Sequence, residues 1–98
     1  MTTTTGVQQL LDRATAILPD SDEDLVYKGV AASVAERMMV LRKAATRLQD
    51  KYGSLEELEE TIKDKGIPPT DHTRYTDLLE WRAIRHEISQ LQHMFETL

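Results

Sequence analysis

An unbroken heptad spacing of apolar residues runs through the middle of the chain. Its members recur at alternating steps of four and three residues: Tyr27, Ala31, Val34, Met38, Leu41, Ala45, Leu48 and Tyr52. A second seam lies nearer the C-terminus, at Trp81, Ile84, Ile88, Leu91, Phe95 and Leu98. Such seams let two long helices lie along one another with interlocking side chains. The spacing therefore predicts a helical packing module, and by itself it indicates no chemistry.

The periodicity predicts an all-α fold with four helices. Their expected ranges are residues 7–18, 22–52, 54–65 and 71–97. The helices over 22–52 and 71–97 would form a long antiparallel hairpin with coiled-coil-like packing, and the short helix would make its corner. Residues 7–98 are expected to form a single helical domain. The threonine-rich residues 1–6 are expected to be a disordered leader.

Local signals place the ends of these helices. Asp20 or Ser21 is expected to cap the long helix, since both side chains accept hydrogen bonds from first-turn amides. Gly53 marks its C-terminal end, because glycine tolerates the left-handed conformation found there. Ser54 and Glu57 have the spacing of a capping box at the start of the corner helix. The sequence thus predicts two helices separated by only a tight turn.

The two seams define the expected core of the hairpin. Its predicted members are Val34, Met38, Leu41, Ala45, Leu48, Trp81, Ile84, Ile88, Leu91 and Phe95. An antiparallel return places the small Ala45 near the large Trp81, as complementary packing requires. A second interpretation of Trp81 is a binding hot spot with Arg82 and Tyr75, because these residue types dominate such spots.

The long helix is apolar well beyond its seam. Val26, Val30, Ala32, Met39 and Val40 widen the stripe past what one partner helix would cover. With 98 residues, the chain also has little surplus core. These five residues are the predicted association surface. A homodimer is the simplest occupant, and a different protein is the alternative.

Charge and composition limit the classes of partner and location. The net charge of −5 argues against nucleic acid as a main partner. The chain has no cysteine, which excludes disulfides and thiolate chemistry. No signal peptide and no apolar stretch of about 20 residues is recognisable, so no membrane contact and a cytoplasmic location are expected.

The long helix is nevertheless locally basic. Its cations include Lys28, Arg37, Arg42, Lys43 and Arg47, and it lies between two acidic segments. Charge complementarity within the fold is the simpler interpretation. The more specific interpretation is a basic strip that binds RNA, which the net charge and the small number of exposed aromatic residues able to stack on bases disfavour.

The pattern of polar residues does not indicate catalysis. His86 and His93 are two helical turns apart, too far to share one metal ion, and His72 stands at a helix start. The glutamates of the corner helix are expected on a wet face, where nothing raises a carboxyl pKa. We therefore expect no enzyme activity, and no catalytic, cofactor-binding or metal-binding residues.

Part of the chain resembles a known group of proteins. The motifs are LQDKYGSLEEL from Leu48, GIP from Gly66 and YTDLLEW from Tyr75. Over residues 48–82 they are similar to small all-helical prokaryotic proteins with a Lys-Tyr-Gly, Ser-x-Glu-Glu corner and a later Glu-Trp. Those proteins are often encoded beside a small toxin-like reading frame and are proposed as antitoxins. The resemblance implies binding and neutralisation of a small basic protein. The chain lacks the DNA-binding fold of many antitoxins.

Two functions of different classes remain. The first is a non-enzymatic protein-interaction module, antitoxin-like, that is a homodimer and binds a small basic partner protein. The alternative is a structural homo-oligomeric helical bundle with no hetero-partner. The first leaves apolar surface exposed in the isolated protein, whereas the second buries it.

The proposed register of the hairpin predicts a cost for enlarging Ala45. The substitution Ala45→Leu should lower the free energy of unfolding by about 1–3 kcal/mol, the usual cost of overpacking, because Trp81 is expected to cover this position. Thermal denaturation followed by circular dichroism measures the effect. An unchanged melting temperature would contradict the register.

Overall fold

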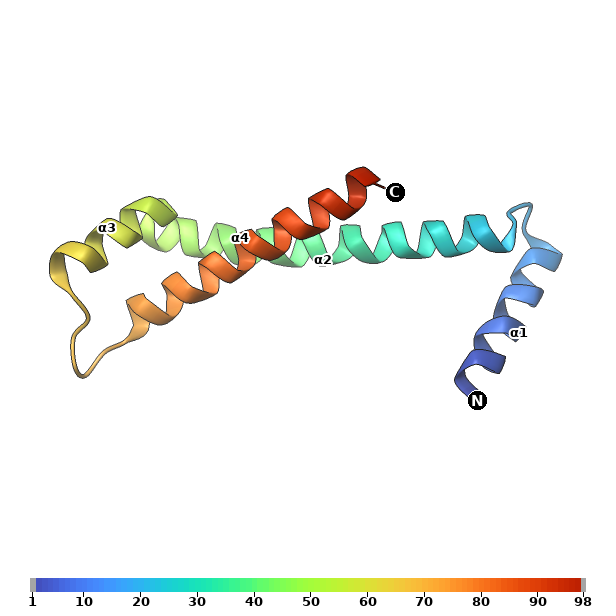
Figure 1. The fold of residues 1–98 in the computed structure, drawn as a ribbon, viewed down its shortest axis with the longest axis horizontal. Helices are drawn as coiled ribbons and strands as arrows, with labels where there is room; N and C mark the ends of the chain where they lie inside the picture. The colour runs from blue at the N-terminus through green and yellow to red at the C-terminus, as the bar shows by residue number, and fades with distance from the viewer. Residues whose placement is uncertain (1, 98) are drawn as a thin grey trace. The chain divides into compact units, whose positions relative to one another are not determined.

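The computed structural model describes residues 2–97, so Met1 and Leu98, the last member of the second seam, lie outside it. Within this range every regular element is an α-helix and there is no strand, which confirms the predicted all-α class (Figure 1). The helices are α1 (Thr2–Ile17), α2 (Asp22–Tyr52), α3 (Leu55–Lys65) and α4 (Thr73–Thr97). No helix among them is long and apolar enough to cross a bilayer.

The chain divides into two compact units, Met1–Ala35 and Glu36–Leu98. The first contains α1 and the beginning of α2. The second contains the rest of α2 together with α3 and α4. Residues 7–98, which the sequence predicts to be a single domain, fall into both of these units.

The helix ends agree with the local signals except at the N-terminus. The range of α2 is the predicted one, and α3 and α4 begin within two residues of their predicted starts. In contrast, α1 begins at Thr2 and includes most of the expected disordered leader, residues 1–6. Threonine costs less than about 0.7 kcal/mol per helical position, so a helix established at Val7 extends through it at small cost.

Reciprocal caps start α2 and α3. Ser21 is the cap of α2: its Oγ accepts from the amide of Asp24 at 3.1 Å, and Asp24 accepts from the amide of Ser21 at 3.4 Å. Ser54 and Glu57 form the predicted capping box, with distances of 3.0 and 2.9 Å. Gly53 between α2 and α3 has φ of 92°, and a Cβ there would collide with the Glu57 carboxylate. The turn therefore requires glycine.

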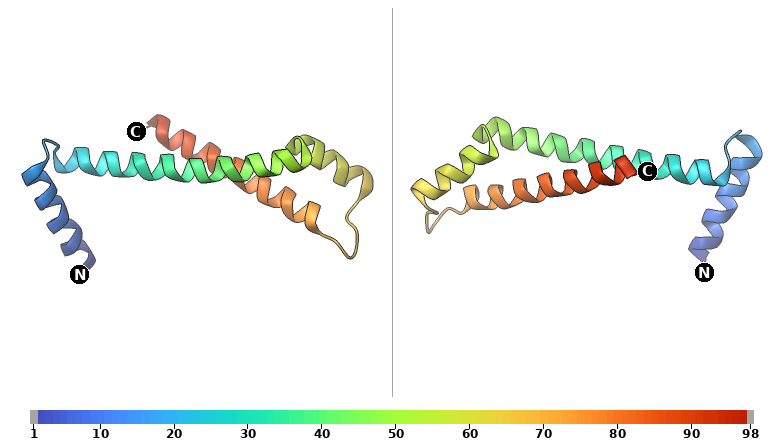
Figure 2. Two further views of the ribbon diagram at one scale, coloured as in Figure 1. Left: turned by 180° about the vertical axis from the view of Figure 1, so that it is seen from behind. Right: turned by 45° about the horizontal axis from the view of Figure 1, so that its top comes forward.

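One hydrophobic cluster holds the second unit together. Its buried members are Leu41, Leu48, Leu55, Leu58, Leu78, Trp81 and Ile84, and they come from all three helices of the unit. The backbones of α3 and α4 approach closely, and α2 packs on α4 through the cluster, as in a hairpin. The right-hand view of Figure 2 shows the end of α3 near the start of α4. The short corner helix is therefore part of the core.

The predicted core residues differ in burial. Leu41, Leu48, Trp81 and Ile84 are buried members of the cluster, and Ala45, Ile88 and Leu91 pack against it half-buried. Val34, in the other unit, is buried, and Met38 is half-buried. Phe95 departs from the prediction because it is 46% exposed, one turn beyond the last α4 residue that touches the cluster.

The most deeply buried side chain predicts the largest loss of stability. Leu58 is 1% exposed, so Leu58→Ala should lower the free energy of unfolding by about 2–5 kcal/mol through lost burial and a new cavity. The matched control Leu79→Ala removes the same atoms from a side chain that is 46% exposed, and it should cost about 1 kcal/mol or less. Urea denaturation measures both. Equal losses would contradict a core centred on α3.

Candidate interaction surfaces

The predicted association residues on α2 are mostly uncovered. In the first unit, Val26 is 53% exposed, Ala32 is exposed and Val30 is half-buried. In the second unit, Met39 is 60% exposed and Val40 is 53% exposed. These side chains are available to a partner.

The first unit carries a second uncovered apolar face, on α1. Val7, Leu10, Ile17 and Leu18 are all exposed, and Ile17 reaches 84%. Their spacing of three, seven and one residues places them on one side of α1 and of the residue that follows it. The sequence pattern predicted this amphipathic face, but only the structure shows that its large apolar side chains are exposed.

Ion pairs use part of the basic charge of α2. Arg37 forms a bidentate pair with Glu87 of α4, and Arg47 lies 3.6 Å from Glu80. The hydrogen bond from Arg37 lowers the pKa of Glu87 below its ordinary value. Lys28 pairs at 3.0 Å with Asp20 in the first unit. Three of the five cations considered for RNA binding thus have carboxylate partners.

A polar hub at the C-terminal end of α2 joins it to α4. The hydroxyl of Tyr52 and the ammonium of Lys51 both donate to Oδ2 of Asp77, and the lysine distance is 3.1 Å. The hydrogen bond from Tyr52, with a contribution from Lys51, lowers the pKa of Asp77. Burial and the same hydrogen bond raise the pKa of Tyr52. Tyr52 ends the first seam, but no sequence pattern indicated that its hydroxyl has a carboxylate partner.

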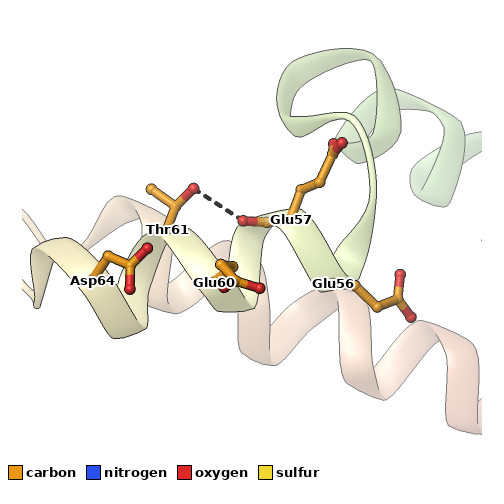
Figure 3. A pocket seen from close by; sticks show the side chains of 5 residues that line it. All are labelled: Glu56, Glu57, Glu60, Thr61 and Asp64. Carbon is orange, nitrogen blue, oxygen red and sulfur yellow. Dashed lines mark hydrogen bonds between the residues drawn. The ribbon is translucent and has the colours of Figure 1, made fainter.

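An acidic hollow of about 350 Å³ lies on α3 (Figure 3). It is lined by Glu56, Glu57, Glu60, Thr61 and Asp64. Glu56 accepts a hydrogen bond from Arg85 of α4 at 3.0 Å, which lowers the pKa of this glutamate. Glu56, Glu57 and Glu60 are among the corner-helix glutamates that the sequence predicts on a solvent-exposed face. Over the described part of the chain, no three histidine or carboxylate side chains gather as a metal site.

A smaller hollow of about 210 Å³ lies at the corner between α2 and α3. Gln49, Gly53, Ser54, Leu55, Glu56, Trp81 and Arg85 line it. Trp81 is only 6% exposed and belongs to the cluster, so this hollow offers little of the indole to a ligand. At the start of α3, the amides of Ser54 and Glu57 are engaged by the reciprocal capping box.

Comparison of the chain with models of protein families, with curated proteins and with solved structures finds no match.

The hub predicts a pH-dependent contribution to stability. Because the folded protein lowers the pKa of Asp77, the stabilisation is complete above the unfolded-state pKa of about 3.9 and disappears as the pH falls through the lower folded-state pKa. At pH 7, Tyr52→Phe should lower the free energy of unfolding by about 1.5–3 kcal/mol, as for a hydrogen bond to a charged group. The loss should shrink at pH 2.

Urea denaturation at the two pH values measures this difference. Tyr75→Phe is the matched control, because Tyr75 is 40% exposed and donates no hydrogen bond among those found in the described residues. If the effect of Tyr52→Phe were the same at both pH values, the charge of Asp77 would not be what the hydroxyl stabilises.

Proposed function

We propose that this protein is a non-enzymatic protein-interaction module. The observation that carries the proposal is the exposure of large apolar side chains on helices of both units, including Leu10 and Ile17 of α1 and Met39 and Val40 of α2. Soluble monomers rarely leave extended apolar surface open to water unless it meets a partner. Amphipathic helices of this kind bind other helices or apolar grooves.

The chemistry of the surface supports a basic partner protein. The net charge is −5, and the acidic hollow on α3 presents Glu60 and Asp64 beside the glutamates already described. A cationic protein would gain in association rate from this field. Together with the resemblance over residues 48–82, this favours an antitoxin-like protein that binds and neutralises a small basic partner. A cytoplasmic location belongs to the same proposal.

The scaffold in this proposal is an antiparallel coiled-coil pairing of α2 with α4. Its support is the order of the ion pairs: Lys51 with Asp77, Arg47 with Glu80, and Arg37 with Glu87. From each of these pairs to the next, the residue number decreases on α2 and increases on α4, which is the order expected for antiparallel helices. Such a paired scaffold keeps the outer side of α2 straight and accessible.

Polar groups with shifted pKa values do not support an enzyme. The shifts at Glu56, Asp77 and Glu87 all have a structural cause, namely a hydrogen bond from a neighbouring side chain. The pKa shifts therefore single out links between helices and no group poised for proton transfer. The alternative function, a structural homo-oligomer without a hetero-partner, is compatible with the same exposed faces.

A variant on α1 tests partner binding. The tagged full chain is purified from its native host, and co-eluting proteins are identified by mass spectrometry. A small basic protein should co-elute stoichiometrically with the wild type and be lost with Leu10→Glu, because the charge disrupts the apolar face. Binding of the dye 1-anilinonaphthalene-8-sulfonate to the isolated protein should fall as well.

The matched control is Gln9→Glu, which adds the same charge at an exposed position on the other side of α1. It should retain both the partner and the dye. A wild-type protein that captures no partner would contradict the proposal. If it also forms homo-oligomers that do not bind the dye, the structural alternative is favoured.

A further inference from the structure

The outer side of α2 carries a small patch of mixed chemistry within the second unit. Glu36, Met39, Val40 and Lys43, here called the α2 patch, are spaced three, one and three residues apart and so share one face of the helix. Met39 and Val40 are more than half exposed, and Glu36 and Lys43 are exposed at the two ends of the patch.

The charges of this patch have no partner within the described residues 2–97. Arg37, Arg47 and Lys51 of the same helix are paired with carboxylates of α4, whereas no ion pair includes Glu36 or Lys43. Neither has an oppositely charged residue three or four positions away on α2. The α2 patch therefore presents an anion, two apolar side chains and a cation, in that order, to solvent.

This order is complementary to itself. The midpoint between Glu36 and Lys43 lies between Met39 and Val40. If a two-fold axis passes through that midpoint, an antiparallel copy places its Lys43 opposite Glu36 and its Val40 opposite Met39. Each contact then occurs twice, as a two-fold symmetric interface requires. A parallel copy in the same alignment would instead place like charges opposite one another.

We propose that a second copy of this chain docks antiparallel on the α2 patch, with the two-fold axis between Met39 and Val40. The inference deepens the proposed function, on which it rests, by naming the occupant of one of its surfaces. A small basic protein fits this patch less well, because Lys43 and the neighbouring exposed Arg42 would repel it. A basic partner protein would therefore bind the acidic and apolar surfaces on other parts of the chain.

Charge reversal provides the test. Sedimentation equilibrium is measured for the wild-type full chain, for Glu36→Lys, for Lys43→Glu and for an equimolar mixture of the two variants. The wild type should dimerise. In each variant alone, both opposed pairs become like-charged, so its dimer should weaken on the order of ten-fold. In the mixture, every opposed pair is again of opposite sign, so a heterodimer should form with nearly wild-type affinity.

Two controls separate this effect from others. Lys63→Glu makes the same change in net charge as Lys43→Glu, at an exposed position on α3, and should leave dimerisation unchanged. Raising the salt concentration should narrow the gap between the wild type and the reversed variants, because screening weakens exposed ion pairs. Circular dichroism checks that each variant keeps its helix content.

The outcomes are distinguishable from those of the proposed function. A dimer that is unaffected by either reversal, or that is not restored by mixing, would overturn docking at the α2 patch while leaving an interaction module in place. A wild type that stays monomeric at every concentration would also overturn it. The proposed function would then be judged by partner capture with Leu10→Glu and its control.

Discussion

The second unit depends on the burial of aliphatic and indole side chains from three helices in one cluster. Its centre is Leu58, which is 1% exposed. A helix of 11 residues such as α3 is marginal by itself, because isolated helices shorter than about 12–15 residues seldom persist in water. Leu55 and Leu58 hold α3 in position because they are buried in the cluster with side chains of α2 and α4. The capping box then sets the residue at which it begins.

Polar contacts surround this cluster and fix its register. Arg82 reaches Glu59 and Arg85 reaches Glu56, joining α4 to α3, while the Asp77 hub joins α4 to the end of α2. Exposed pairs of this kind contribute little free energy individually. They nevertheless oppose sliding of one helix along another, since a shift of one turn would separate several opposite charges at once.

Sequence periodicity and cap chemistry were enough to predict the helices of the second unit. The seam found Leu41, Leu48, Trp81 and Ile84, because a period near 3.5 residues leaves few alternatives for long helices. The same reasoning carried the seam too far, to Phe95, since a periodic pattern does not show where the neighbouring helix ends. It also assigned the first threonines to a leader, because their low helix propensity is a weak signal.

The functional surfaces were predicted less completely, for a physical reason. Apolar residues outside a seam, such as Met39 and Val40, look alike in sequence whether a third helix covers them or not. Only their exposure in the fold identifies them as available. The Tyr52–Asp77 contact was not predicted either, since it joins residues on two helices whose relative rotation the sequence does not specify.

The position of Trp81 has a spectroscopic consequence. It is the only tryptophan of the chain, and it is buried in the cluster formed by α2, α3 and α4. Indole emission therefore reports loss of packing in that cluster, and α1 contains no tryptophan of its own. Far-ultraviolet ellipticity, in contrast, sums over every helix. The difference between the two traces during heating would record how independently the helix at the N-terminus melts.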